Sequence, residues 1–287
     1  MHEDDFPALY RSADELSLEA QTHFFRTLKF HLVLLVGAAV LSATSFPHWS
    51  VATLQLIVLL GALSCSIYLF SKRPDRYWYA GRAVAESIKT ITWRFVCRAE
   101  PFHCDDNRAR SDFQQKLKSI VDQNKDVAQA LTKYLDAPQI TAAMTQMRTR
   151  SLDERKSRYA ESRIKDQLTW YAKKAAFNRK TSSCFFWALI VMNGIAVFFA
   201  ILRVTFTTVP YWPTDVFVVA AASLLTWMQA KRFSELAASY ALASHEIGLI
   251  REQSLQPNTD AEFSSFVGDA ENAFSREHTQ WVARKDA

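Results

Sequence analysis

The chain has 287 residues and a formal net charge of +5, and 49% of its residues are hydrophobic. Six glycines and eight prolines are too few for a turn-rich all-β chain or a disordered one, so we expect helices. The small positive excess is weak support for a nucleic-acid partner, and we predict none. The mean hydropathy of −0.09 is that of a soluble protein, because the apolar residues are concentrated in two regions.

The first apolar region covers residues 32–70 and contains no Lys, Arg, Asp or Glu. A Pro-His-Trp turn at 47–49 divides it, and each arm approaches the roughly 20 residues that cross a bilayer as a helix. The region therefore predicts a transmembrane hairpin with spans over about 28–46 and 51–70. The acidic N-terminus is unlike a secretory signal peptide, so we expect an uncleaved anchor.

Polar segments flank this hairpin on both sides. An amphipathic helix over 12–31, capped by Ser12 or Ser17, leads into it. The segment that follows is basic and begins with Lys72 and Arg73. The positive-inside rule places this side in the cytoplasm together with the N-terminus.

The middle of the chain predicts cytosolic helices. The first of them carries an i, i+4 ion pair between Arg82 and Glu86 and ends near Pro101. Shorter helical patterns cover about 110–124 and 126–135. A long charged helix is expected over about 141–180, where the sign of the charge alternates.

The second apolar region predicts another hairpin, with spans over about 182–202 and 214–230. It ends at the basic pair Lys231 and Arg232, so four crossings leave both termini cytoplasmic. Two further helices, over about 231–253 and 260–284, are too polar to span.

The two halves repeat one plan: an amphipathic helix, a membrane hairpin with an aromatic outer turn, a basic segment and a cytosolic helix. We therefore predict an all-α membrane protein built from two parallel repeats, residues 1–138 and 139–287.

Several stretches of this sequence resemble the tandem form of the SLATT family. They are WYAGRAVAESIKTITWRFVCRAEPF, LYRSADELSLEAQ, RYAESRIKDQLTWYAKKAAFNRK and REHTQWVARK, and the likeness covers about 6–102 and 150–285. Members are two-transmembrane helical domains of bacterial conflict systems, associated with nucleotide-synthesising and nucleotide-sensing domains. The resemblance implies a membrane effector, a pore-former triggered by a nucleotide signal, and it brings no catalytic residues.

No pattern of an enzyme is found. The glycines are too few for a phosphate loop, and the seven histidines show no paired metal spacing. Cys65, Cys97, Cys104 and Cys184 lack zinc spacing and are expected to be buried, inert thiols. We predict no enzyme, no catalytic residue, no metal and no cofactor.

Two groups of residues are candidates for function. Polar residues inside the spans need partners in hydrocarbon, and they either line a wet path in an oligomer or hydrogen-bond between helices; they are Gln55, Ser64, Ser66, Asn193 and Thr226. Charged and aromatic residues of the first cytosolic helix form either a regulatory surface that holds a nucleotide or an ion-pair lattice between helices; they are Trp78, Arg82, Glu86, Lys89, Trp93 and Arg94.

The favoured function is a membrane effector of a bacterial anti-phage system that oligomerises and forms a pore in, or perturbs, the inner membrane on a nucleotide-type signal. The alternative is a non-conducting scaffold whose cytosolic helices dock a partner protein. The expected partners are the lipid bilayer, further copies of the chain, and a nucleotide second messenger or a cytosolic sensor protein. A multi-pass inner-membrane location is expected.

Overall fold

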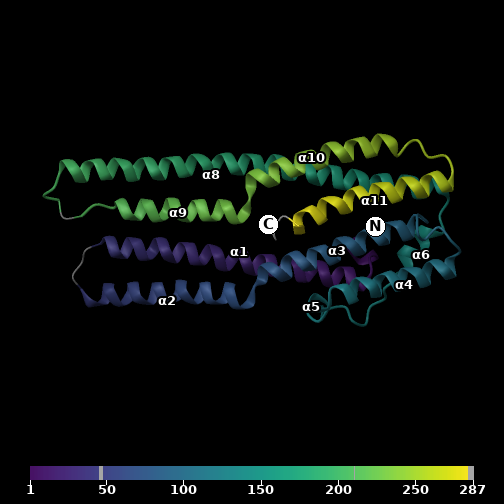
Figure 1. Ribbon diagram of the computed structural model, residues 1–287, viewed down its shortest axis with the longest axis horizontal. Coiled ribbons are helices and arrows are strands. Elements are labelled where there is room, and N and C mark those ends of the chain that lie inside the picture. The colour runs from purple at the N-terminus through teal and green to yellow at the C-terminus, as the bar shows by residue number, and fades with distance from the viewer. Residues whose placement is uncertain (45–47, 210, 284–287) are drawn as a thin grey trace. The chain divides into compact units, whose positions relative to one another are not determined.

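The computed structural model describes residues 1–44, 48–209 and 211–283 (Figure 1). All regular structure in these ranges is helical, as predicted. The longer helices are α1 (Ala8–Ala43), α2 (Trp49–Lys72), α3 (Pro74–Val96), α4 (Asp106–Gln123), α8 (Asp166–Thr205), α9 (Thr214–Lys231), α10 (Phe233–Gln253) and α11 (Asp260–Ala283). The shorter ones are η1 (Glu3–Asp5), α5 (Lys125–Ala128), α6 (Ala142–Arg148), α7 (Leu152–Tyr159) and the π-helical η2 (Ala160–Lys165).

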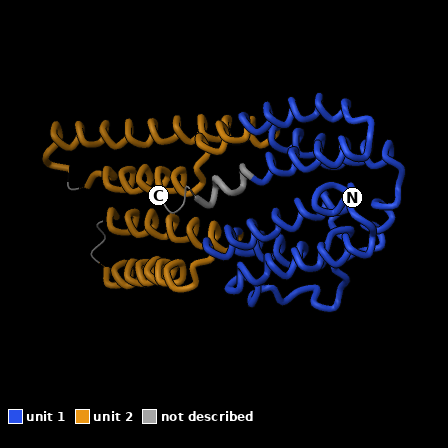
Figure 2. Tube along the Cα trace, turned by 45° about the vertical axis from the view of Figure 1, so that its right-hand side comes forward, with its two compact units in different colours: residues 1–21, 75–172, 241–287 blue, residues 22–74, 173–240 orange. Residues whose placement is uncertain are grey.

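The chain forms two compact units, and each takes residues from both halves of the sequence (Figure 2). Unit 1 consists of residues 1–21, 75–172 and 241–287, and unit 2 of residues 22–74 and 173–240. The compact units therefore differ from the two sequence repeats, whose boundary at residue 138 stays a prediction.

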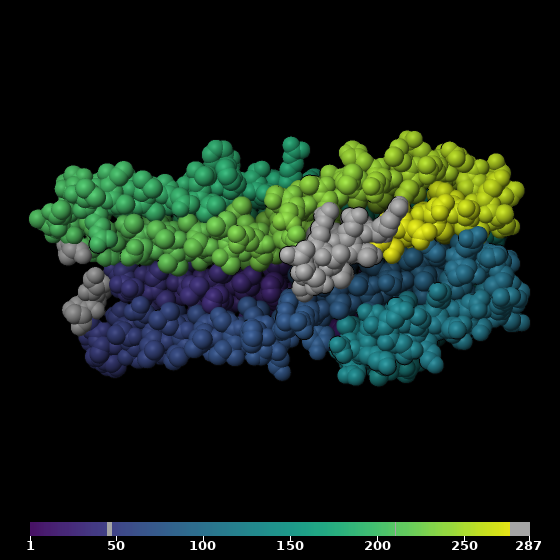
Figure 3. All heavy atoms as spheres, viewed as in Figure 1, coloured from purple at the N-terminus to yellow at the C-terminus, as the bar shows by residue number. Residues whose placement is uncertain are grey.

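Unit 2 contains the apolar helices, with α1 beside α2 and α8 beside α9 (Figure 1). Side chains fill the space between the ribbons of α8 and α9 (Figure 3). In the first hairpin, the ring of His31 hydrogen-bonds through Nδ1 to the carbonyl oxygen of Ala62 at 3.0 Å. Large apolar side chains lie exposed along the helices; Ile57, Leu63, Trp187 and Phe198 are each more than half exposed. Exposed apolar surface of this extent is typical of helices that face lipid.

Three helical stretches in the described residues are long and apolar enough to cross a membrane: Ala8–Ala43, Trp49–Val96 and Leu152–Thr205. They contain the first three predicted spans, except for the end of the first: residue 44 follows the helix, and residues 45–46, with the turn residue Pro47, lie outside the described residues. The fourth predicted span, α9, is not among them. This helix has 18 residues and carries Asp215 in its first turn and Lys231 in its last, which shortens its apolar part. The four-span arrangement stays a prediction.

Unit 1 has an aromatic core. The rings of Phe95, Phe102 and Phe113 contact one another at centroid distances of 4.8 to 5.9 Å. Next to them, Trp93 packs edge-on against Tyr159 at 5.7 Å, and both side chains are buried. This core joins α3, α4 and α7 within the unit.

Buried arginines stabilise the ends of helices in unit 1. Arg148 donates hydrogen bonds to the carbonyl oxygens of Phe95 at 2.8 Å and Cys104 at 3.0 Å. Arg155 donates to the carbonyl oxygen of Cys97 at 2.8 Å. Carbonyls at the end of α3, which have no partner within the helix, thus receive hydrogen bonds.

The predicted helix over 141–180 is not continuous, because it breaks between α6 and α7. Ser151 and Glu154 form a capping box there: the Ser151 hydroxyl accepts from the Glu154 backbone N–H at 3.4 Å, and the Glu154 carboxylate accepts from the Ser151 N–H at 3.2 Å. This local motif starts a new helix at Leu152. The charge pattern of the segment gave no sign of it.

Other boundaries differ as well. The predicted caps Ser12 and Ser17 lie inside α1, which begins at Ala8. In place of the predicted helix over 126–135, the four-residue α5 is found. Helix α3 ends at Val96, ahead of the predicted Pro101.

The four cysteines are free thiols. Cys97 is buried, as predicted, and burial raises the pKa of its thiol. Cys184 on α8 is exposed, so the prediction of burial is wrong for this residue.

Candidate functional site

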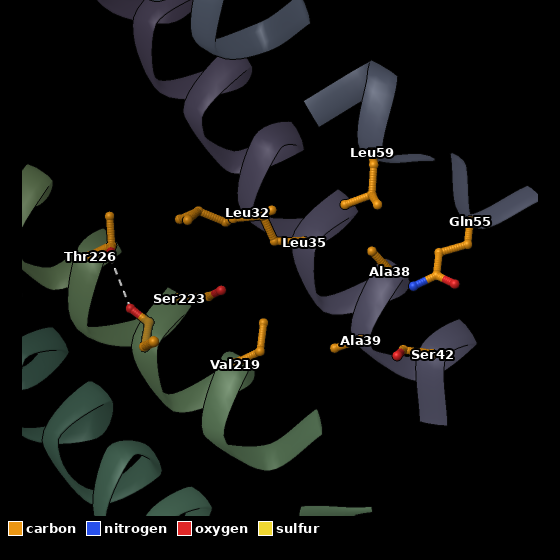
Figure 4. A pocket seen from close by; sticks show the side chains of 11 residues that line it. Leu32, Leu35, Ala38, Ala39, Ser42, Gln55, Leu59, Val219, Ser223 and Thr226 are labelled. Carbon is orange, nitrogen blue, oxygen red and sulfur yellow. Dashed lines mark hydrogen bonds between the residues drawn. The ribbon is translucent and has the colours of Figure 1, made fainter. Parts of the chain in front are cut away.

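A cavity of about 450 Å³ lies within unit 2, between α1, α2 and α9 (Figure 4). Seven of its lining residues are apolar and four are uncharged polar residues. The lining residues are Leu32, Leu35, Ala38, Ala39, Ser42, Gln55, Leu59, Val219, Ala222, Ser223 and Thr226.

Helical periodicity places these residues together. On α1, residues 32, 35, 39 and 42 are three, four and three positions apart, so they share one face of the helix. On α9, residues 219, 222, 223 and 226 share a face in the same way. Ala38, Ala39 and Ala222 fill little volume, and the space left between the helices is the cavity.

The polar groups in the lining differ in their hydrogen bonds. The Thr226 hydroxyl donates to the carbonyl oxygen of Ala222 at 2.9 Å, the contact dashed in Figure 4. Its oxygen can still accept hydrogen bonds. The Gln55 side chain extends from α2 toward α1 (Figure 4), and its amide makes no hydrogen bond within the described part of the chain. An amide in hydrocarbon requires a partner, and a water molecule or a polar ligand in the cavity would supply one.

The structure brings together only two of the five polar candidates, Gln55 and Thr226. The other three do not line the cavity, and each donates to a carbonyl oxygen of its own helix: Ser64 to Leu60 at 2.8 Å, Ser66 to Ala62 at 3.3 Å, and Asn193 to Leu189 at 2.9 Å.

Ser42 and Ser223 line the cavity but were not predicted as members of a polar site. Ser223 precedes Thr226 by three residues, and this spacing could have indicated a shared face. Ser42 had no such signal, because its partners come from other helices.

An aromatic contact closes the space between α1 and α9 near one end of the cavity. The rings of Phe25 and Trp227 meet edge-on at 5.8 Å. The ammonium of Lys231 lies 3.3 Å from the Phe25 ring centroid and 5.2 Å from that of Trp227. We call these three residues the Lys231 cluster; cation–π attraction fixes the position of its charge.

In unit 1, the predicted regulatory residues do not form one open surface. Trp93 is 1% exposed, so its assignment to a surface is wrong: the indole packs in the core. Arg82 and Glu86 form the predicted ion pair at 3.1 Å. Arg94 reaches α11, where its guanidinium donates to the carbonyl oxygen of Gly268 at 3.0 Å and to the side-chain oxygen of Asn272 at 2.7 Å.

The remaining regulatory candidates are half-buried. The Trp78 ring stacks on that of Tyr79 at 4.4 Å. Burial lowers the pKa of Lys89, although the nearby Glu86 carboxylate acts in the opposite direction. These contacts favour the ion-pair lattice over a surface of free cations.

The most buried charges of unit 1 were not predicted. Arg163 on η2 pairs with Glu271 on α11, with side-chain exposures of 1% and 0%. The Tyr159 hydroxyl donates to the same carboxylate at 2.9 Å. The sequence gives no signal for this pair, because 108 positions separate its members.

Comparison with protein families gives two matches on this chain. Residues 7–156 match the SMODS and SLOG-associating 2TM effector domain 3, and residues 159–281 match the SMODS and SLOG-associating 2TM effector domain 1. The chain is a tandem SLATT-domain protein. No curated protein and no solved structure matches it.

SLATT domains are effector domains associated with bacterial conflict and defence systems. Both SLATT domains build the cavity, since Ser42 and Gln55 belong to the first and Ser223 and Thr226 to the second. The hydrogen bond from Arg94 to Asn272 likewise joins the first SLATT domain to the second within unit 1.

Proposed function

We propose that this tandem SLATT protein is a membrane effector that oligomerises and permeabilises the bacterial inner membrane when it receives a nucleotide-type signal. In this proposal unit 2 crosses the membrane four times, unit 1 lies in the cytoplasm, and both termini are cytoplasmic. The observation that supports it best is the cavity of unit 2, where both SLATT domains contribute polar groups among apolar helices.

The chemistry of the lining suits a narrow water-filled path. Gln55, Ser42, Ser223 and Thr226 offer hydrogen bonds to water, and the other lining residues are apolar and small or flexible. Such a lining conducts when hydrated and blocks conduction when it dewets. Because all its residues are uncharged, the lining itself is expected to select little between anions and cations.

Regulation is assigned to unit 1. Helices α1, α8 and α10 each contribute residues to both units, so a change in unit 1 has a continuous covalent route into unit 2. The cations Arg82, Arg94 and Arg163 are engaged with acceptors of the same unit. In this proposal the signal is a nucleotide that displaces these contacts, or a cytosolic sensor protein that has bound one.

Conductance of the purified protein in planar bilayers tests this proposal, together with membrane potential and dye uptake in expressing cells. Under activating conditions we expect current that falls severalfold for Gln55→Leu and Thr226→Val. Ser64→Ala is the matched control, since Ser64 bonds only its own helix, and it should leave the current unchanged. Intact membranes and no current in the presence of candidate nucleotides and the partner would contradict the proposal.

A second candidate function is a non-conducting scaffold without catalytic activity. Its support is an exposed apolar row on α10, where Leu242 and Leu249 are 62% and 63% exposed and lie seven residues apart. This spacing places both on one helix face that could dock a helical partner. Stable co-purification of a cytosolic protein, lost in Leu242→Glu, together with absence of current, would favour this reading over a pore.

A further inference from the structure

We propose that the cavity of unit 2 binds one acyl chain of an anionic phospholipid, whose phosphate lies at the Lys231 cluster. This inference requires only that unit 2 is embedded in a bilayer, and it does not depend on the pore of the proposed function.

The cavity is a groove that is open to its surroundings. Leu32 and Ala38 are buried and form its floor. Leu59, Ala222 and Thr226 are exposed at its edges, so a hydrocarbon chain can enter sideways from the membrane. An acyl chain would cover the seven apolar lining residues, which water solvates poorly. The groove with the chain in place is the closed state of the proposed path, which conducts only when water replaces the chain.

The dimensions suit a lipid chain. The groove follows α1 from Leu32 to Ser42, and the ten steps between these residues rise about 15 Å in a helix. This is half of the roughly 30 Å hydrocarbon core, the depth of one leaflet. Its volume of about 450 Å³ falls in the range of pockets that hold small ligands.

Positively charged side chains lie at one end of the groove. Leu32 and Thr226 form one end of the groove. Phe25 lies on the same face of α1 as Leu32, seven positions earlier, and Trp227 directly follows Thr226 on α9. The Lys231 cluster therefore lies just beyond this end of the groove. Arg26 and Lys29 are exposed on the same turns of α1. A phosphate at this end would meet cations, while the chain that follows it meets uncharged residues.

Unit 2 as a whole carries a strong charge asymmetry. Its residues 22–74 and 173–240 contain eleven Lys or Arg but only two acids, Asp215 and Glu235. Glu235 is already engaged by Arg232 at 2.7 Å. Of the eleven cations, only Arg203 lies near a hairpin turn; the others lie in the parts of the helices that are far from the turns. Juxtamembrane cations attract anionic lipid by about fivefold for each charge.

This asymmetry also favours a lipid over a second copy of the chain as the occupant. A second copy seated in the groove with the same orientation would place its own positive end there and would not neutralise the charge. An anionic lipid neutralises the same end.

Native mass spectrometry of the full chain tests the proposal. The protein is taken from nanodiscs made of equal parts phosphatidylglycerol and phosphatidylcholine, and the retained lipid is weighed. We expect retained phosphatidylglycerol in wild type and at least a fivefold loss in Ala222→Phe, which fills the groove. Ala200→Phe is the matched control, because Ala200 is exposed on α8 outside the groove, and it should retain lipid.

A second pair of variants tests whether the lipid headgroup binds at the Lys231 cluster. Lys231→Gln should reduce the preference for phosphatidylglycerol over phosphatidylcholine about fivefold, whereas Arg203→Gln should not change it. Equal retention of both lipids by wild type and by Lys231→Gln would overturn the headgroup assignment.

A measurement on the wild-type chain does not depend on whether variants fold. Phosphatidylglycerol with a photoreactive diazirine in its acyl chain, added at one equivalent in detergent, should label residues 32–42 and 219–226. Labels spread evenly over the outer faces of α2 and α8, or dimers cross-linked through the groove with no lipid bound, would overturn the proposal. If the wild-type protein retains lipid but shows no conductance, that result would contradict the pore of the proposed function and not the lipid site.

Discussion

Arg163 binds Glu271 through two parallel hydrogen bonds, from Nε to Oε1 at 2.9 Å and from Nη2 to Oε2 at 2.8 Å. Both side chains are almost completely buried, and the Phe274 ring lies 4.8 Å from the guanidinium. The pair fastens α11 to η2 inside unit 1. Burial raises the pKa of the adjacent Tyr159 well above its usual range, so this phenol stays protonated and donates to the carboxylate.

Removing one partner should be costly. Glu271→Leu leaves the Arg163 charge buried without its counter-ion, and we expect a loss of about 3 to 5 kcal/mol in the free energy of unfolding. The double variant Arg163→Met/Glu271→Leu removes both charges and should recover most of this loss. Thermal unfolding in detergent measures the loss in the single variant and the recovery in the double variant. Glu161→Gln, in an exposed pair with Lys165, is the control and should cost less than about 1 kcal/mol. A Glu271→Leu variant as stable as this control would contradict the prediction.

Two glycines should respond to alanine with opposite signs. At Gly81 on α3, an added Cβ would lie 3.2 Å from the carbonyl oxygen of Ala13 and 3.3 Å from the backbone and side chain of Ser17. Ser17 is itself held there, since its hydroxyl donates to the carbonyl oxygen of Trp78 at 3.0 Å. Gly81→Ala should therefore push α1 and α3 apart and cost about 1 to 3 kcal/mol.

The matched position is Gly248 on α10, where nothing lies within 4 Å of an added Cβ. Gly248→Ala should stabilise the protein by about 0.4 to 1 kcal/mol, because alanine restricts the unfolded chain and favours the helix. If Gly81→Ala and Gly248→Ala shift the melting temperature in the same direction, the α1–α3 contact is less tight than described.

Stability should depend on pH through Asp14. Burial raises the pKa of its carboxyl above the ordinary 3.8, although Arg82 and Lys89 oppose this effect. Between 3.8 and the raised value, the unfolded chain loses this proton while the folded chain keeps it. The free energy of unfolding therefore falls as pH rises through this window, and the loss is complete above it.

Asp14→Asn removes the ionisation, so it should stabilise the protein at neutral pH, with a gain that disappears below pH 3.8. Melting temperatures at neutral and acidic pH measure this difference. Asp122→Asn, at an exposed position, should change little at either pH. A stability gain that is the same at both pH values would rule out the titration of Asp14 as its cause.

The contact between Arg94 and α11 should control local opening. Asn272→Ala removes one acceptor of Arg94, and Arg94→Ala removes both donated bonds. We expect faster backbone hydrogen exchange in α11, more for Arg94→Ala, with little change in α4. Arg110→Ala is the control, since its guanidinium bonds Thr145 on α6 and not α11. Exchange in α11 at the wild-type rate in Arg94→Ala would mean that other contacts hold the helix.

The sequence by itself determined the features that depend on short stretches of chain. Residues 32–70 without a charged side chain predict apolar helices whatever surrounds them, and Arg82 and Glu86 pair because the helix places them one turn apart. The quoted motifs also indicated two SLATT domains, which the family matches confirm.

The tertiary structure alone decided which of these residues meet. Gln55 and Thr226 share a cavity while Ser64 and Asn193 do not, because membership depends on which helix faces approach across 171 positions of chain. The same reason hides Trp93 in a core and joins Arg163 to Glu271. Helical period fixes the face on which a side chain lies, but the partner of that face is set by packing between distant segments, which no local pattern encodes.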